Sequence, residues 1–166
     1  MGHTLSSKGI EMQMEMAQWV LDMAAPNDTH GVRSFLGLAS YYRRFIKRFA
    51  KMAKTLTAML TAKSIFKWGP GEQSSFVKLR QVVAKGPILM QPNFKAIQFS
   101  VPSFLVATDA SDYALGGVLS QMDEDGNERP IYFHSRKFTS AKANYATTEK
   151  ERLAVVSSMQ KFRPYI

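Results

Sequence analysis

The spacing of apolar residues predicts helices in the first half of this chain and strands in the second. Residues 3–12 alternate around a glycine-containing turn, which is typical of a hairpin. Residues 13–24 carry apolar side chains at helical spacing, and Pro26 ends this predicted helix. From Thr29 the sequence predicts a second helix of about twenty residues, and residues 55–62 predict a short further helix.

The second predicted helix is amphipathic, with apolar and basic residues on opposite faces. Its apolar stripe consists of Phe35, Leu38, Tyr42, Phe45, Ile46 and Phe49. Its basic residues, which we call the basic ridge, are Arg44, Lys47, Arg48 and Lys51. Such a ridge can contact nucleic-acid phosphates, because each neutralised phosphate releases counterions. The alternatives are a solvated face or a contact with anionic lipid.

The middle of the chain combines one helix with a less regular segment. Gly69-Pro70-Gly71 breaks the preceding pattern, and Glu72–Lys85 then follow a helical spacing that Gly86-Pro87 ends. Residues 88–102 are punctuated by prolines and show no sustained period. They predict a linker with short extended pieces.

From residue 103 the pattern predicts three strands and a final helix. The second and third strands, over residues 114–122 and 129–135, are joined by an Asp-Gly-Asn turn that favours a hairpin. The final helix is expected from Thr147 to Phe162. The fold class is therefore predicted to be α+β, with a helical segment followed by a small antiparallel sheet and a helix.

Composition excludes several kinds of protein. An apolar content of 45% argues against disorder, and the lack of cysteine excludes disulfides and thiolate metal sites. No run of eighteen apolar residues and no secretory leader is visible. We therefore expect an intracellular protein of the cytoplasm or nucleus, without a membrane partner.

The net charge of +9 is concentrated in one segment of the chain. Residues 31–67 hold nine Lys or Arg and no Asp or Glu, whereas the remaining residues hold thirteen basic and thirteen acidic side chains. This distribution indicates a local surface for a polyanion.

Two carboxylates have the placement expected of metal ligands in a nuclease. Asp109 follows an apolar run where a predicted strand ends, and Glu151 lies in the first turns of the last helix. Two-metal nucleases use a pair of divalent ions to activate a water and to stabilise the leaving oxygen. Such hard cations prefer oxygen ligands, which Asp109 and Glu151 would supply from two different elements.

Each of these carboxylates also has a purely structural interpretation. Asp109 can be a turn residue that accepts hydrogen bonds from nearby backbone N–H groups. Glu151 can complete a capping box with Thr148. We expect Asp112 to be a turn residue and Glu149, two positions before Glu151, to face solvent.

Several motifs, in order along the chain, carry a family resemblance. They are Arg33–Ile46 (RSFLGLASYYRRFI), Thr108–Asp112 (TDASD), Ser135–Lys137 (SRK) and Asn144–Glu151 (NYATTEKE). With these motifs the chain resembles the reverse transcriptase and ribonuclease H region of a gypsy-like LTR retrotransposon Pol polyprotein.

The resemblance implies a division of the chain. Residues 1–26 would end the polymerase palm, 27–65 would form a thumb-like helical segment, 66–102 a connection, and 103–166 a partial ribonuclease H-like domain of three antiparallel strands and a helix. Gly37 and Tyr41 match positions where the thumb helix of the family follows the minor groove. Asp109 and Glu151 match Mg²⁺ ligands of the family's two-metal site.

The resemblance also implies a function. The parent protein would synthesise DNA on an RNA template and cleave the RNA strand of RNA–DNA hybrids, so the expected partners are such duplexes and the remainder of the Pol polyprotein. The chain contains no Asp-Asp pair and no acidic residue after Glu151, so we expect it to lack both activities on its own. The alternatives are a catalytically inactive nucleic-acid-binding remnant, or a decayed sequence whose sheet edge is left open to aggregation.

Overall fold

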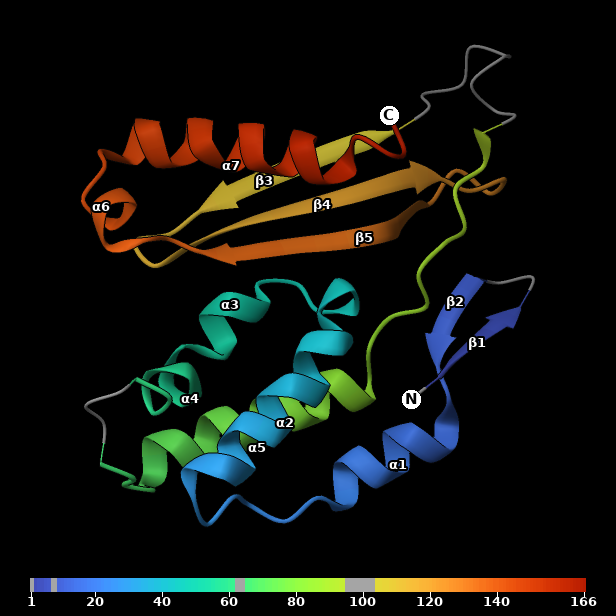
Figure 1. The fold of residues 1–166 in the computed structure, drawn as a ribbon. Coiled ribbons are helices and arrows are strands. Elements are labelled where there is room, and N and C mark those ends of the chain that lie inside the picture. The colour runs from blue at the N-terminus through green and yellow to red at the C-terminus, as the bar shows by residue number, and fades with distance from the viewer. Residues whose placement is uncertain (1, 7–8, 62–64, 95–103) are drawn as a thin grey trace.

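A three-stranded antiparallel sheet lies between one long helix and a group of shorter helices in the computed structural model (Figure 1). The strands are β3 (Leu105–Ala110), β4 (Ala114–Met122) and β5 (Glu128–Lys137), in that order. Helix α7 (Thr147–Phe162) covers one face of the sheet. The structure describes residues 2–6, 9–61, 65–94 and 104–166. The α+β fold class, with its three strands and final helix, is confirmed.

Helix α7 approaches the sheet closely because the strand beneath it carries a glycine. A Cβ atom built on Gly117 of β4 would lie only 2.9 Å from the Cβ atom of Ser158 in α7. The packing on either side is apolar, with Ala154 against Leu115 and Phe162 against Leu119. The sheet lobe, residues 104–166, is therefore held together by this helix–sheet contact.

The described residues before Met90 form a helical lobe with its own core, whereas Met90 packs on the sheet lobe. The main helices of the helical lobe are α1 (Met14–Asp22), α2 (Thr29–Tyr41) and α5 (Pro70–Ala84), whose buried side chains include Val20, Val32, Phe35, Phe76, Leu79 and Val83. Local chemistry fixes the starts of two of them. The Asp28 side chain accepts a hydrogen bond from the Gly31 N–H at 2.6 Å, and Glu72 accepts one from the Gly69 N–H at 3.0 Å. The predicted breaker Gly69-Pro70-Gly71 therefore begins α5, with Gly69 as the N-cap residue.

The predicted N-terminal hairpin is confirmed as β1 (His3–Ser6) and β2 (Gly9–Met12), and its turn at residues 7–8 lies outside the described residues. Ile10 of β2 exchanges two backbone hydrogen bonds with Leu89, at 2.7 and 2.8 Å. The predicted linker thus begins with a bridge to the hairpin, and its residues 95–102 lie outside the described part of the chain. No helix within the described residues is long and apolar enough to cross a bilayer.

The long second helix predicted from Thr29 is wrong, because α2 ends at Tyr41. The chain continues through η1 (Arg43–Phe45), a turn in which Arg48 has a φ of 56°, α3 (Phe49–Met52) and α4 (Lys54–Ala58). No Gly or Pro occurs between residues 42 and 49 to mark this break. The predicted apolar stripe is nevertheless buried, apart from Leu38, which is partly buried.

The broken segment, residues 43–50, packs against the face of the sheet opposite α7. Ser135 of β5 is the main attachment point: its carbonyl accepts a hydrogen bond from the Arg43 guanidinium, and its hydroxyl accepts one from the Ala50 N–H at 3.0 Å. Phe133, two residues earlier on β5, packs against the helical core. These tertiary contacts account for the turn that the local sequence did not predict.

The close approach of α7 gives a test of the packing. We predict that Gly117→Ala lowers the free energy of unfolding by about 1–3 kcal/mol, because the added methyl group overpacks the contact with Ser158. The matched control is Gly116→Ala, whose new Cβ atom would meet no atom closer than 3.8 Å. Urea denaturation of the three proteins measures the effect, and equal destabilisation by both substitutions would contradict this packing.

Candidate metal and nucleic-acid site

Asp109, the first candidate metal ligand, lies near the end of β3 and faces the helical lobe. It is in register with Gly116 of β4, which is in turn paired with Ser135 of β5. Its Oδ2 atom lies 2.7 Å from Nη2 of Arg48, and about half of each side chain is exposed. An ion pair with this exposure stabilises by about 0–1 kcal/mol. The contact is thus weak enough for a competing ligand to replace.

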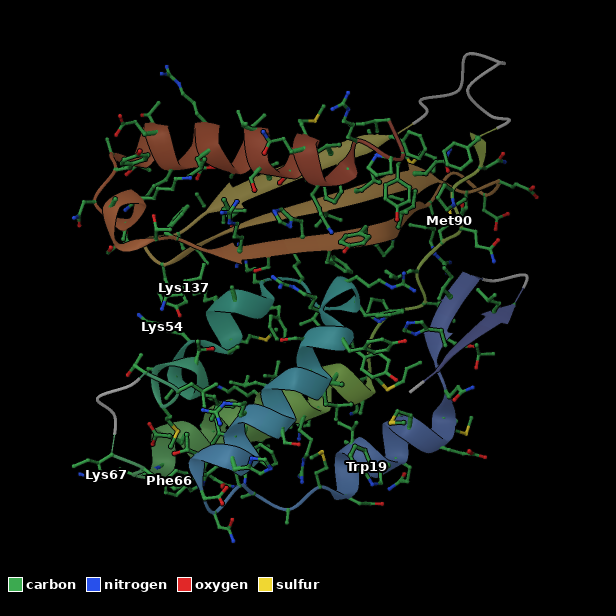
Figure 2. The ribbon with its side chains drawn as sticks, in the orientation of Figure 1. Trp19, Lys54, Phe66, Lys67, Met90 and Lys137 are labelled. Atoms are coloured by element: carbon green, nitrogen blue, oxygen red, sulfur yellow. The ribbon has the colours of Figure 1, made fainter. Side chains whose placement is uncertain are left out.

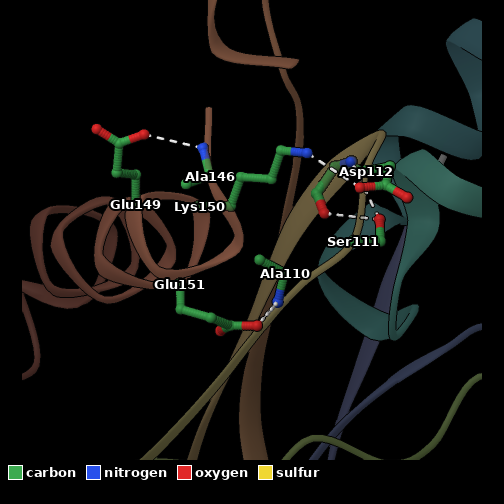
Figure 3. Close-up of polar contacts among 8 residues, drawn as sticks. Ala110, Ser111, Asp112, Ala146, Glu149, Lys150 and Glu151 are labelled. Carbon is green, nitrogen blue, oxygen red and sulfur yellow. Dashed lines mark hydrogen bonds and ion pairs between the residues drawn. The ribbon is translucent and has the colours of Figure 1, made fainter. Parts of the chain in front are cut away.

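Glu151, the second candidate ligand, reaches β3 from α7. Its Oε1 atom accepts a hydrogen bond from the Ala110 N–H at 3.2 Å (Figure 3). Ala110 directly follows Asp109, so Glu151 contacts β3 next to Asp109, whereas the Asp109 side chain pairs with Arg48 on the other face of the sheet. Each is held by a protein donor, and within the described ranges no group of three or more His, Cys, Asp or Glu side chains could hold a metal ion.

The capping box predicted between Thr148 and Glu151 is wrong. Glu149 instead accepts a hydrogen bond from the Ala146 N–H at 2.8 Å, so it fixes the start of α7 while it remains exposed (Figure 3). This arrangement leaves Glu151 free to reach β3.

Asp112 has an ionic role that sequence reasoning missed. The hydrogen bonds of the turn after β3 are made by Ser111, which bonds to both backbone groups of Ala114. Asp112 lies 3.0 Å from Nζ of Lys150, a side chain that is largely buried (Figure 3). The hydrogen bond and charge of Lys150 lower the pKa of the Asp112 carboxyl group. This pair ties the start of α7 to the β3–β4 turn.

The basic ridge does not form one face of one helix, because the helix ends before it. Arg44 is partly buried over the ring of Phe45, at 5.1 Å from its centroid. The other three cations lie beside Asp109. Arg48 and Lys51 line a cavity of about 140 Å³ with Asp109, and Lys47 and Arg48 line an adjoining cavity of about 200 Å³ with the same carboxylate.

Gly37 and Tyr41 both lie exposed on α2. A Cβ atom on Gly37 would meet nothing within 4 Å, so packing inside the chain does not require glycine there. Tyr41 stacks on His3, with ring centroids 5.3 Å apart. Gly37 also lines a groove of about 580 Å³ between α1 and α2, together with Met16, Trp19, His30, Arg33, Ser34 and Leu38.

Trp19 is a residue of this groove that sequence reasoning missed. It is one of the apolar residues at helical spacing in residues 13–24, and 55% of its surface is exposed. The exposure of Trp19 and the open space beside Gly37 are visible only in the structure.

His134 of β5 lines the cavity that contains Lys47 and Asp109. Its Nε2 atom lies 3.1 Å from the Ser157 hydroxyl. Burial, with the charges of Arg43, Lys161 and Arg136, lowers the pKa of His134 to about 4. The ring is therefore neutral in the folded protein at neutral pH.

The lowered pKa of His134 predicts a loss of stability in acid. The unfolded chain binds a proton at this histidine near its ordinary pKa of 6.5, before the folded protein does, so the stability that depends on the neutral ring is lost as the pH falls from 6.5 towards 4. Urea denaturation across this range should show that the free energy of unfolding falls less for His134→Gln than for the unchanged protein. If the free energy of unfolding falls equally with pH in both proteins, the acid sensitivity does not come from His134.

Comparisons with known proteins identify the family of this chain. Residues 68–166 match the family described as the RNase H-like domain found in reverse transcriptase. The whole chain is 32% identical to part of the Retrovirus-related Pol polyprotein from transposon 412 of Drosophila melanogaster, and 99% of it is 31% identical to part of the Transposon Tf2-3 polyprotein of Schizosaccharomyces pombe. It spans only 13% and 12% of the lengths of these relatives.

Solved structures share the fold. A foamy viral protease-reverse transcriptase in complex with double-stranded DNA superposes with a TM-score of 0.78 at 18% identity, over 99% of this chain and 28% of that one. The same kind of protein in complex with an RNA/DNA hybrid gives a TM-score of 0.77 at 19% identity, over 98% and 21% of the two chains. The chain therefore belongs to the family of RNase H-like domains found in reverse transcriptases, and corresponds to a segment of a gypsy-like retrotransposon Pol polyprotein.

Proposed function

We propose that this chain binds RNA–DNA duplexes and supplies Asp109 and Glu151 to a divalent-metal site that cleaves the RNA strand in the full polyprotein. In this proposal residues 27–65 act as the thumb-like segment, and residues 103–166 belong to the ribonuclease H domain. The observation that carries the proposal is the hydrogen bond from the Ala110 N–H to Glu151, which brings a carboxylate of α7 to the residue after Asp109.

The carboxylates of Asp109 and Glu151 are chemically suited to bind a hard cation. Carboxylate oxygens are the ligands that Mg²⁺ prefers, and Asp109 and Glu151 would hold the ion. A divalent ion bound there would supply activation of a water and charge stabilisation at the leaving oxygen. Arg48 neutralises Asp109 until it is displaced, and its guanidinium is then available to a phosphate.

The charges around Asp109 also favour a nucleic-acid partner. A lone carboxylate repels a phosphate backbone, but Lys47, Arg48 and Lys51 line the cavities that contain Asp109. The foamy viral proteins that share this fold were solved with double-stranded DNA and with an RNA/DNA hybrid, which are polyanions. DNA synthesis and RNA cleavage are activities that we propose for the complete protein.

A catalytically inactive nucleic-acid binder is the second candidate. The ion pair between Arg48 and Asp109 favours it, because a carboxylate that serves only as an anchor for Arg48 needs no metal. The two candidates differ in one property: only the metal-dependent nuclease should bind a divalent ion at Asp109.

Metal binding tests this difference through Mn²⁺, which broadens nearby NMR signals. We expect Mn²⁺ to broaden the amide signals of Ala110 and Glu151, and Asp109→Asn or Glu151→Gln to abolish this effect. Arg48→Gly should tighten Mn²⁺ binding about fivefold, since it removes a competing ion pair worth about 1 kcal/mol. The fold should survive, because glycine relieves a left-handed conformation that costs arginine about 1 kcal/mol.

The matched control is Lys51→Ser, which removes a positive charge from the same cavity but leaves the ion pair intact. It should change Mn²⁺ affinity less than Arg48→Gly does. If Mn²⁺ leaves the Ala110 and Glu151 signals unchanged while the protein still binds an RNA–DNA hybrid, the metal assignment is wrong and the inactive binder is favoured.

Gly37→Ala separates stability from duplex binding. The substitution should raise the free energy of unfolding by about 0.8–1.0 kcal/mol, because alanine favours the helix. It should weaken hybrid binding several-fold if the duplex backbone approaches α2 at this point. Fluorescence anisotropy of a labelled hybrid measures binding, and Gly71→Ala is the control, because that α5 glycine also has open space at its Cβ position. If both variants bind the hybrid with equal affinity, Gly37 does not contact the duplex.

A further inference from the structure

A second basic cavity lies where the helical lobe meets the end of β5. Its volume is about 310 Å³, and it is lined by Arg43, Phe49, Ala50, Ala53, Thr57, Tyr113, Arg136 and Lys137. Three of these residues carry positive charge and none carries negative charge. The cavity adjoins the one that contains Asp109, because Ser135 lines that cavity and the next two residues of β5 line this one.

Tyr113 organises the charges of this cavity. The Lys137 ammonium group lies 5.1 Å from the centroid of the Tyr113 ring, and the ammonium group of Lys54, from α4, lies 4.9 Å from the same centroid. Figure 2 shows Lys137 at the end of the sheet and Lys54 on the neighbouring helical lobe. Two cations from different lobes thus share one aromatic ring, which attracts each of them weakly.

The two ammonium groups repel each other. The charge of Asp112 also acts on Lys54, but the Asp112 carboxylate is already paired with Lys150. The two ammonium groups lie at most about 10 Å apart, because both are about 5 Å from one centroid. That separation is close to the screening length of about 8 Å at physiological salt, so part of the repulsion persists. Within the part of the chain that the structure describes, Lys54, Arg136 and Lys137 have no carboxylate within 4.0 Å. A bound anion would relieve this repulsion.

We propose that the Tyr113 end of this cavity binds a backbone phosphate of the nucleic-acid strand, through the ammonium groups of Lys54 and Lys137. The inference rests on the proposed function, since it extends the duplex-binding surface from Asp109 along β5. Lysine and arginine are the usual phosphate-binding side chains. A phosphate held by Lys54 on one side and by Lys137 on the other would fix the helical lobe to the sheet when the duplex is bound.

The salt dependence of hybrid binding tests the proposal. For the Lys54→Ser/Lys137→Ser protein, fluorescence anisotropy should show affinity for a labelled RNA–DNA hybrid reduced several-fold. The slope of log affinity against log salt should fall by about 1 for each phosphate contact removed. The control is Lys161→Ser, because Lys161 also lies over a tyrosine ring, at 5.3 Å from the Tyr132 centroid, but on α7 across the sheet. Its slope should equal that of the unchanged protein.

A second measurement separates this proposal from the proposed function. Titration with inorganic phosphate should shift the NMR signals of the Tyr113 ring, leave those of Tyr132 in place, and have no effect on Tyr113 in the double variant. If the protein binds no hybrid, the proposed function is wrong. The response of the Tyr113 signals to phosphate then tests the anion site independently.

Two outcomes overturn the proposal. If the protein binds the hybrid with an unchanged salt slope in the double variant, this cavity does not contact the strand, and a phosphate-induced Tyr113 shift would then show a site for free phosphate instead. If neither the slope nor the Tyr113 signals change, the cavity binds no anion.

Discussion

The docking of residues 43–50 on β5 is the contact on which the rest of this structure depends. Ser135 of β5 accepts two hydrogen bonds from this segment: its carbonyl accepts one from Arg43, and its hydroxyl accepts one from the Ala50 N–H. To present both donors to one strand, the chain turns after Tyr41 and again at Arg48. The left-handed conformation of Arg48 costs about 1 kcal/mol, and the docking contacts on either side of it offset this cost.

This docking also decides the chemistry at the end of β3. It carries the guanidinium of Arg48 to Asp109, while α7 brings Glu151 to the next residue from elsewhere in the fold. Asp109 therefore has a cation from its own chain where the proposed function requires a divalent ion. The competition is feasible because a half-exposed ion pair contributes at most about 1 kcal/mol. One segment would thus serve both as part of the helical core and as the source of the cations that face a duplex.

The sequence was informative where local chemistry and periodicity determine structure. The final helix was predicted with its observed ends, Thr147 and Phe162, and the apolar stripe was predicted to be buried. The break after Tyr41 was missed because no Gly or Pro marks it and tertiary contacts with β5 produce it. The pairing of Arg48 with Asp109 was missed for the same reason, since it joins residues far apart in the chain. Glu149, and not Glu151, caps α7, a choice between two glutamates that spacing alone did not decide.

In the proposed function, Asp109 and Glu151 together bind a divalent ion in place of Arg48. Crystals grown with Mn²⁺ test it most directly, because anomalous scattering locates the ion. We expect a manganese peak in contact with both carboxylates and an Arg48 guanidinium withdrawn from Asp109. A map with the Arg48–Asp109 pair intact and no manganese peak at either carboxylate would contradict it.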